Sequence, residues 1–495
     1  MKKILISGLV AMSLALTSCD SYLDVNESPN SPNVDNVSSD LIFPGAEMCL
    51  ADCYSDFLRI PSGYFAQYYA QMFGTSNYLD YSKFNQSSSL SSRMFTTMSA
   101  GALQNLSTVI AKSEASDSKG DILAATVLRV ICYQALIDCY GEIPYSEALD
   151  PANITPKYDD GKDVYAGLLA ELDAALADCN GTESVCTNFL FPGSRADKWI
   201  QTANAIKLRL LMRESGVVDV KQQLDELIAQ DNFPTSDVAW KGCWSNESGQ
   251  ANPYYQEEFA TYFGSTQQNV ILNIALLAAM NKSDDGRLKV WFNPNSDKGD
   301  YTGGVSGSNF STSSSYKAGY WCRPNVAYDD PVVLISVAEI YFFLAEYQAR
   351  YGSADKAKEY YQAAIEASFA SAGASGADRV LDAYPYDNAN YAKCIGIQKW
   401  IALAHINPFE GYCELRRLKY PAFGSVTGQQ IYDDLNDAYD PSLLEPGTLY
   451  TPLYVNAQLG SDKVLQRWPY PESSANRNNK TPSFKGYGTP IFWAE

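Results

Sequence analysis

Apolar residues recur every three or four positions in several long segments of the chain, which is the spacing of one buried helix face. The clearest stripes occupy residues 124–135, 165–176, 199–210, 334–345 and 357–365. The last two stripes are joined by a short link containing Gly352 and Ser353, residues typical of a helix end and a helix start. This pair predicts a helix hairpin of about tetratricopeptide size. Further hairpins are expected at 121–178, 196–230 and 391–417.

Other stretches lack a helical period. Residues 240–265 and 281–330 are rich in Gly, Ser, Asn, Tyr and Trp, which predicts long loops with some short strands. Long loops on a rigid scaffold usually carry function. The stretch from Tyr450 is rich in Pro and Asn and predicts an extended wrap rather than a helix.

We therefore expect a mainly α fold. It combines a tetratricopeptide-like scaffold of about four helix pairs with long irregular insertions and a few short strands. A single domain at 41–495 would hold the scaffold at roughly 41–235 and 331–420, a ligand-binding insertion at roughly 236–330 and a C-terminal wrap at 421–495.

The N-terminus has the pattern of an export signal. Lys2 and Lys3 precede the apolar stretch 4–16, which is too short to span a bilayer comfortably. The string Leu16-Thr17-Ser18-Cys19 resembles a bacterial lipobox, so we expect a signal peptide at 1–18 and lipidation of Cys19. The alternative is an ordinary signal peptide with a chance Cys. Residues 19–40 would form a tether, and no later stretch reaches about 18 uninterrupted apolar residues, so the mature protein is expected to be anchored rather than spanning.

Charge and histidine content narrow the function classes. The 495 residues include 57 acidic and 37 basic side chains, a net charge of −20, which argues against a nucleic-acid partner. One histidine, His405, nearly excludes multi-His metal sites, and its place in an apolar helix favours packing over catalysis. No G-x-S-x-G or H-E-x-x-H motif occurs. We expect no catalysis and no cofactor, although 57 acidic residues leave a glycosidase carboxylate pair open.

Ten cysteines remain besides Cys19. Export permits disulfides, and several of the ten lie in apolar helical stripes, where buried thiols are common. Cys179 and Cys186 flank a short Asn-Gly loop and are the best disulfide candidates. Without a CxxC pair or a His cluster, metal binding is not expected.

An ordered set of strings resembles the SusD/RagB family of Bacteroidetes outer-membrane lipoproteins. The strings are Tyr140–Leu149, Thr155–Asp159, Lys198–Arg213, Gln398–Leu403, Arg416–Pro421 and Arg467–Pro471. They span essentially the whole mature chain. Each alone is weak, but their order behind a lipobox makes the resemblance strong.

The resemblance implies a cell-surface binding protein. Members of this family fold as tetratricopeptide-like helix pairs with a larger irregular region and cap a SusC-type TonB-dependent transporter. They capture oligosaccharides, or peptides in some members, and hand them to that barrel. We therefore expect a lipid-anchored outer-membrane protein facing the cell exterior. The leaflet stays open because different sorting systems read Asp20 differently. The alternatives are a peptide-capturing member, a non-catalytic surface scaffold and a surface glycosidase.

The candidate ligand residues are chosen by composition. A sugar ring is recognised by an aromatic face beside planar polar groups, and the loops offer both. Each ring could instead pack its loop against the scaffold. The expected ligand-binding residues are Asn77, Tyr78, Tyr81, Trp291, Tyr320, Trp321 and Arg323.

Overall fold

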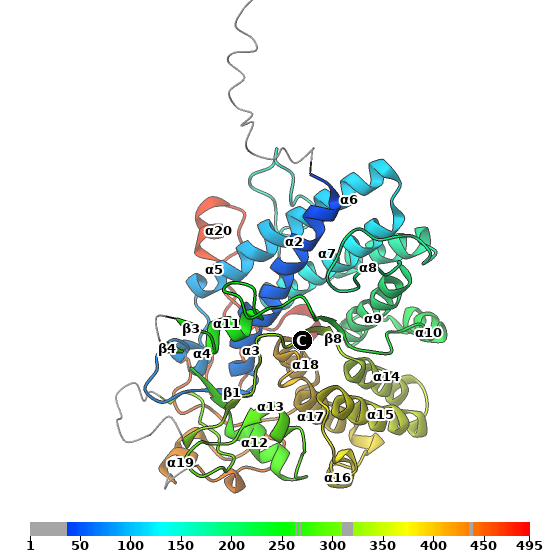
Figure 1. The fold of residues 1–495 in the computed structure, drawn as a ribbon. Helices are drawn as coiled ribbons and strands as arrows, with labels where there is room; N and C mark the ends of the chain where they lie inside the picture. Colours follow the sequence, from blue (N-terminus) through cyan, green and yellow to red (C-terminus); the bar gives the residue numbers. More distant parts are fainter. Residues whose placement is uncertain (1–36, 263–264, 267–268, 309–319, 435–438) are drawn as a thin grey trace, which may run out of the picture.

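The computed structural model describes residues 37–262, 265–266, 269–308, 320–434 and 439–495. Helices form most of it, and short strand pairs join the insertion to the scaffold (Figure 1). The fold is therefore mainly α, as the hydrophobic periodicity predicts. The expected lipidation site Cys19 lies outside the described residues.

The first part of the scaffold ends before residue 235 and consists mainly of helices. They are α2 (Ser39–Asp52), η2 (Cys53–Phe57), α3 (Arg59–Phe65), α4 (Leu79–Ser82), α5 (Ser88–Thr96), η3 (Thr97–Leu103), α6 (Gln104–Ser116), α7 (Lys119–Tyr140), α8 (Gly161–Asp178), α9 (Asp197–Glu214) and α10 (Lys221–Ala229). From α6 to α10, helices that follow one another in the chain pack side by side. Three of the five apolar stripes fall on α7, α8 and α9.

The second part follows the insertion. It contains α14 (Val337–Tyr351), α15 (Ala354–Ala372), α16 (Ala377–Ala383), η5 (Asn388–Asn390), α17 (Tyr391–Leu403) and α18 (Pro408–Leu418). The predicted α14–α15 hairpin is confirmed, with the N–H of Gly352 bonded to the carbonyl of Gln348. The Ser353 hydroxyl accepts the N–H of Lys356 at 3.2 Å and caps α15.

One helix in the described part, α7, is long and apolar enough to cross a membrane. Nearly all of its side chains are buried inside the protein. The length and apolar character of α7 therefore match its place in the core, where it packs against α6, α8 and α9.

The insertion contains short elements. They are β2 (Val238–Trp240), α11 (Pro253–Glu258), β3 (Thr261–Tyr262), β4 (Ser265–Thr266), β5 (Val270–Leu272), α12 (Ile274–Asn281), α13 (Leu288–Trp291), β6 (Phe292–Asn293), β7 (Arg323–Pro324) and β8 (Val332–Ile335). All strand pairs are antiparallel: β1 (Tyr69–Gln71) with β5, β2 with β8, β3 with β4, and β6 with β7. The β1–β5 pair fastens the insertion to the first helices.

The C-terminal stretch is mostly irregular and runs across both parts of the molecule. Its short helices are α19 (Gly428–Asp433), η6 (Pro441–Leu443), α20 (Glu472–Arg477) and η7 (Phe492–Ala494). α20 lies beside α5 at one end of the molecule, and the C-terminus lies in the middle of the view beside α18 (Figure 1).

Two groups of buried residues form the core. The larger one fills the space between the scaffold helices. The smaller one lies under the insertion, where Phe73 and Trp321 meet Tyr439 and Tyr450 of the C-terminal stretch. The C-terminal stretch therefore covers the insertion as well as the scaffold.

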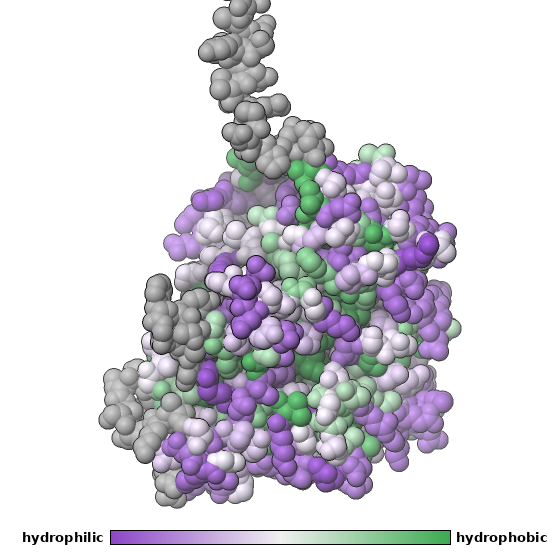
Figure 2. All heavy atoms as spheres, viewed as in Figure 1, coloured by the Kyte–Doolittle hydropathy of each residue, from purple (hydrophilic) through white to green (hydrophobic). Residues whose placement is uncertain are grey.

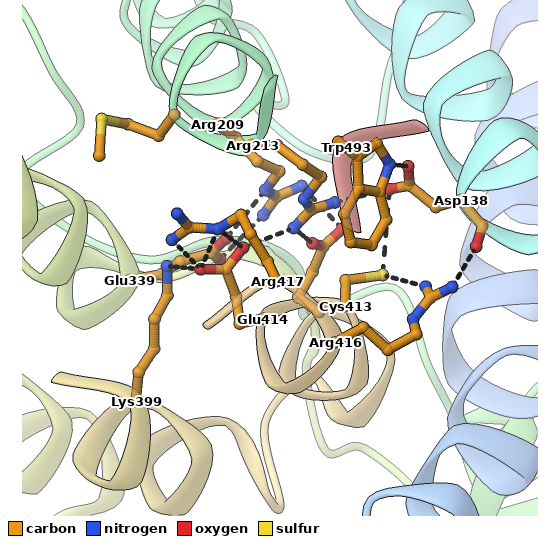
Figure 3. Close-up of polar contacts among 12 residues, drawn as sticks. Asp138, Arg209, Arg213, Glu339, Lys399, Cys413, Glu414, Arg416, Arg417 and Trp493 are labelled. Atoms are coloured by element: carbon orange, nitrogen blue, oxygen red, sulfur yellow. Dashed lines mark hydrogen bonds and ion pairs between the residues drawn. The ribbon is translucent and has the colours of Figure 1, made fainter. Parts of the chain in front are cut away.

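Buried charged side chains join the scaffold helices (Figure 3). They come from α7, α9, α14, α17 and α18: Asp138, Arg209, Arg213, Glu339, Lys399, Glu410, Glu414, Arg416 and Arg417. Arg209 donates two hydrogen bonds to the carboxylate of Glu339, at 2.8 and 2.9 Å. Arg213 reaches Asp138 at 2.6 Å and Glu410 at 2.5 Å. We call this group the charge network.

The C-terminus closes the charge network. The indole N–H of Trp493 donates to Asp138 at 2.8 Å, and the Arg416 guanidinium lies 4.9 Å from the ring. Arg416 also donates to the backbone carbonyl of Asp138, while Arg417 pairs with Glu346. Both Arg416 and Arg417 therefore have partners within the fold.

The disulfide predicted between Cys179 and Cys186 is wrong. All ten cysteines of the described part are free thiols. Cys179 instead donates to the carboxylate of Glu183 at 3.4 Å, and burial raises the pKa of both thiols. Six of the ten are fully or nearly fully buried in the larger core: Cys53, Cys132, Cys139, Cys179, Cys322 and Cys413.

Candidate ligand-binding surface

Two predicted residues, Tyr78 and Tyr81, form a pair at the start of α4. Their rings stack with centroids 5.8 Å apart at 21°. Both are partly buried, and neighbouring Asn77 is exposed. The Tyr78 hydroxyl donates to Glu257 of α11 at 3.3 Å. Burial, and then the nearby Glu258 and Glu257 carboxylates, raise the pKa of Tyr78 far above its usual value, so the hydroxyl stays a donor.

Arg323, at the other end of the insertion, reaches the same helix. Its guanidinium lies 4.8 Å from the ring of Phe259, and it donates to the carbonyl of Glu258 at 3.4 Å. Partial burial lowers the pKa of Arg323 from its usual value. Loops 245 positions apart in the sequence therefore meet at α11.

Three further rings extend this group, and sequence reasoning missed them. Tyr255 stacks on Phe259 with centroids 6.2 Å apart, and Tyr328 meets Tyr255 edge-on at 6.4 Å. All three are partly exposed. Asn252 followed by Pro253 is a helix-start signal, and it would have placed Tyr255 and Phe259 one turn apart on one face.

Side-chain hydrogen bonds fix both ends of α11. The Asn252 side chain caps the helix by accepting the N–H groups of Tyr254 and Tyr255, and its own amide donates to the carbonyl of Asp330. At the other end, buried Glu258 accepts from the backbone and side chain of Asn269 at 2.9 and 3.0 Å. Burial raises the pKa of Glu258, and these hydrogen bonds oppose the shift.

We call this group the α11 surface. It consists of Asn77, Tyr78, Tyr81, Tyr255, Glu257, Phe259, Arg323 and Tyr328. Apolar and polar residues are interleaved on this face of the molecule (Figure 2). Partly exposed rings beside an amide, a carboxylate and a guanidinium are the groups that recognise the C–H faces and hydroxyls of sugars.

The structure does not place the predicted Trp321 at this surface. Its indole is 2% exposed and stacks on Phe73 with centroids 4.6 Å apart, with Tyr439 at 5.5 Å. The prediction of an exposed platform there is corrected: Trp321 is a core residue of the insertion. Tyr320 is partly buried against the same core, and its carbonyl accepts the Thr302 hydroxyl.

Trp291 is also removed from the set of platform rings. It is 3% exposed. Its ring stacks on that of His405, with centroids 5.8 Å apart and planes 8° apart, and the Arg287 guanidinium lies 5.4 Å from it. No open face remains for a sugar. His405 packs against this ring, as its apolar helix predicted, and burial lowers the pKa of His405 well below its usual value.

No metal centre is assembled in the part of the chain that the structure describes. Within it, no group of three or more His, Cys, Asp or Glu side chains is placed to hold a metal ion.

Comparison with solved structures shows the same fold in other proteins. A SusD homologue from Bacteroides uniformis has a TM-score of 0.74 at 23% identity and covers 92% of this chain and 99% of its own. A chitin-binding SusD homologue from Flavobacterium johnsoniae has a TM-score of 0.71 at 19% identity and covers 91% and 98%. A SusD homologue from Bacteroides ovatus has a TM-score of 0.71 at 19% identity and covers 92% of this chain and 99% of its own.

Comparison by sequence is consistent with this likeness. No curated protein matches the chain. Residues 43–442 match a SusD-like family described as starch-binding and associating with the outer membrane. That match covers most of the chain and includes the ordered strings from Tyr140 to Pro421. The chain therefore belongs to the SusD/RagB family.

Proposed function

We propose that this protein is a lipid-anchored, cell-surface binding protein that captures oligosaccharides and delivers them to a SusC-type TonB-dependent outer-membrane transporter. The observation that carries the proposal is the α11 surface, where partly exposed rings and planar polar groups lie around one short helix in a chain of the SusD/RagB family. The protein acts by binding, without catalysis.

The α11 surface suits a chain of sugar rings. Tyr78, Tyr255 and Tyr328 offer flat apolar area with a hydroxyl at one end, which contributes contact with little loss of side-chain freedom. Glu257 can accept hydrogen bonds from sugar hydroxyls, whereas Arg323 can donate hydrogen bonds to their oxygens. Tyrosines serve peptide ligands equally well, so a peptide cargo is the alternative. The starch-binding description of the family and the chitin-binding relative favour oligosaccharide.

Anchoring and partner follow from the N-terminus. Lipidation at Cys19 would hold the protein at the outer membrane by one end, with residues 20–40 as a tether. A protein fixed in this way cannot carry cargo across the membrane itself. A barrel transporter is therefore required, and this protein would act as its hinged lid.

Single substitutions at the α11 surface test the site. Tyr255→Ala and Tyr78→Ala should each weaken retention of the full-length protein on the recognised polysaccharide by about tenfold, since each removes one ring contact. Tyr360→Ala is the matched control, because Tyr360 is a partly exposed ring on α15 within the scaffold.

Affinity electrophoresis in gels containing polysaccharide measures the effect, and thermal melting of each variant excludes unfolding. Unchanged retention for both Tyr255→Ala and Tyr78→Ala, with normal melting, would exclude this surface as the glycan site. Retention of peptides instead of glycans would assign the protein to the peptide-capturing alternative.

A further inference from the structure

A cavity of about 230 Å³ lies where the insertion meets the scaffold. It shares no residue with the α11 surface. Its polar lining comes from α3, the N-cap of α11, the loop 325–331, the end of α15 and the segment after α17: Arg59, Asn252, Asn325, Asp330, Ser371 and His405. Its size is below that of pockets for drug-sized ligands, so it suits a small molecule.

Two opposite charges line this cavity without neutralising one another. Arg59 is 9% exposed, and it donates from Nε to the Tyr69 hydroxyl at 3.2 Å and from Nη2 to the carbonyl of His405 at 2.6 Å. In the described part of the chain, its Nη1 has no hydrogen-bond partner. Arg59 therefore retains donors for a ligand.

Asp330 supplies the matching acceptor. One of its carboxylate oxygens accepts the N–H of Ala327 at 2.9 Å, and no described residue donates to the other. Arg59 lowers the pKa of Asp330 through its charge, against the larger effect of burial, yet no ion pair joins these two residues within the described chain. The cavity therefore presents a separated positive donor and negative acceptor.

The rings beside the cavity offer no stacking platform. Trp291 is 3% exposed between His405 and Arg287, and Tyr254 is 1% exposed beneath the Arg59 guanidinium at 4.5 Å. A sugar ring would find neither face open. The remaining wall is aliphatic, made by Val290, Val326, Val333, Ala372 and Ile406.

From this arrangement we infer that the cavity is a second binding site, for a small zwitterion of the α-amino-acid class. Its carboxylate would accept from Arg59 and its ammonium group would donate to Asp330, while an aliphatic side chain would contact the valine and isoleucine wall. The inference goes beyond oligosaccharide capture and does not depend on it, because the two sites have no residue in common.

The chain itself supplies a specific reporter. His405 is the one histidine in the sequence and lines the cavity, so full-length protein labelled with ¹³C-histidine gives one imidazole signal. The probes are L-leucine, N-acetyl-L-leucine without the ammonium group, L-leucinamide without the carboxylate, and glucose. L-Leucine should shift the signal at a concentration at least about tenfold lower than either leucine analogue, because each charged hydrogen bond is lost separately. Glucose should leave it unchanged.

A substitution separates the two charges. Asp330→Asn should remove the preference for L-leucine over N-acetyl-L-leucine and keep the preference over L-leucinamide. Asp329→Asn is the matched control, because Asp329 is exposed and does not line the cavity. A shift with glucose but none with L-leucine would replace the inference with a sugar subsite. Equal responses to all three leucine compounds, or no response to any probe, would overturn it.

Discussion

Exposure separates two kinds of aromatic residue in the insertion. Tyr78 is partly exposed, with its hydroxyl bonded to Glu257, whereas Trp321 is 2% exposed and lies flat on Phe73. Both residues lie in loops rich in Tyr or Trp, so composition alone cannot distinguish an exposed ring from a buried one. The two residues differ in role because only Tyr78 has exposed ring area that a ligand could contact.

Trp321→Ala should therefore act on stability. Removing a buried indole leaves a hole beneath the insertion and should lower the free energy of unfolding by about 3–5 kcal/mol. Chemical denaturation of the full-length protein measures the change, and glycan retention should persist below the transition. A nearly unchanged unfolding free energy together with lost retention would return Trp321 to the binding surface.

Glu214 should make stability depend on pH. Burial raises its pKa to about 7, only slightly opposed by Lys162, so the folded state binds this proton more tightly than the unfolded state does. The stabilising contribution is complete below about pH 4.5 and is lost as the pH rises through 7. Glu214→Gln removes this loss.

Relative to the parent protein, Glu214→Gln should gain up to about 3 kcal/mol of stability between pH 5 and pH 8. Urea unfolding at these two pH values measures the gain. The same difference between the two proteins at both pH values would mean that Glu214 is already ionised in the fold.

The charge network fixes α18 relative to its neighbours. Glu410 lies between Arg209 and Arg213 of α9, which also hold α14 through Glu339 and α7 through Asp138. Such a network specifies one packing arrangement, since any shift of a helix would leave a buried charge unpaired.

Glu410→Ala should lower the free energy of unfolding by about 3–5 kcal/mol, because it leaves two buried guanidinium groups short of a partner. Glu226→Gln is the matched control, an exposed carboxylate on α10 whose loss should change stability by less than about 0.5 kcal/mol. Equal, small effects of both substitutions in urea unfolding would show that water replaces the buried carboxylate.

Hydrophobic period predicted the elements that bury one face. It identified α7, α8, α9, α14 and α15, and the Gly352–Ser353 link fixed the last hairpin. It could not identify α12, whose residues Ile274–Met280 are buried on every side and show no amphipathic pattern. It also missed α11, which is too short for a period to be visible.

The α11 surface could be predicted only in part, because it forms between distant loops. Tyr78 and Arg323 both contact α11, whereas Trp291 and Trp321 lie in the core. In irregular segments no periodicity tells which side of a ring faces solvent. Contacts between residues such as Phe73 and Trp321, which decide burial, are set by the three-dimensional fold.

Taken as a whole, the molecule has a scaffold, an insertion and a C-terminal stretch that covers both. Tyr439 and Tyr450 pack under the insertion, and Trp493 reaches the charge network near α7. This arrangement makes a rigid support for ligand-binding loops, which suits a protein that presents cargo at a membrane surface.

Delivery to a transporter predicts a stable membrane complex. Affinity purification of the full-length protein from mildly solubilised outer membranes should yield a second, barrel-sized protein in comparable amount. Cys19→Ala, which removes the lipidated residue, should release the protein from the membrane and reduce recovery of that partner. Repeated purification without a barrel-sized protein under mild conditions would argue against the lid role.

Oligosaccharide capture is tested most directly by a binding screen of the full-length protein against polysaccharides and peptides together. We expect retention by one class of polysaccharide and by no peptide, with the retention weakened in Tyr255→Ala. Retention by peptides alone would contradict oligosaccharide capture, and silence on both sets would favour a surface scaffold without a small ligand.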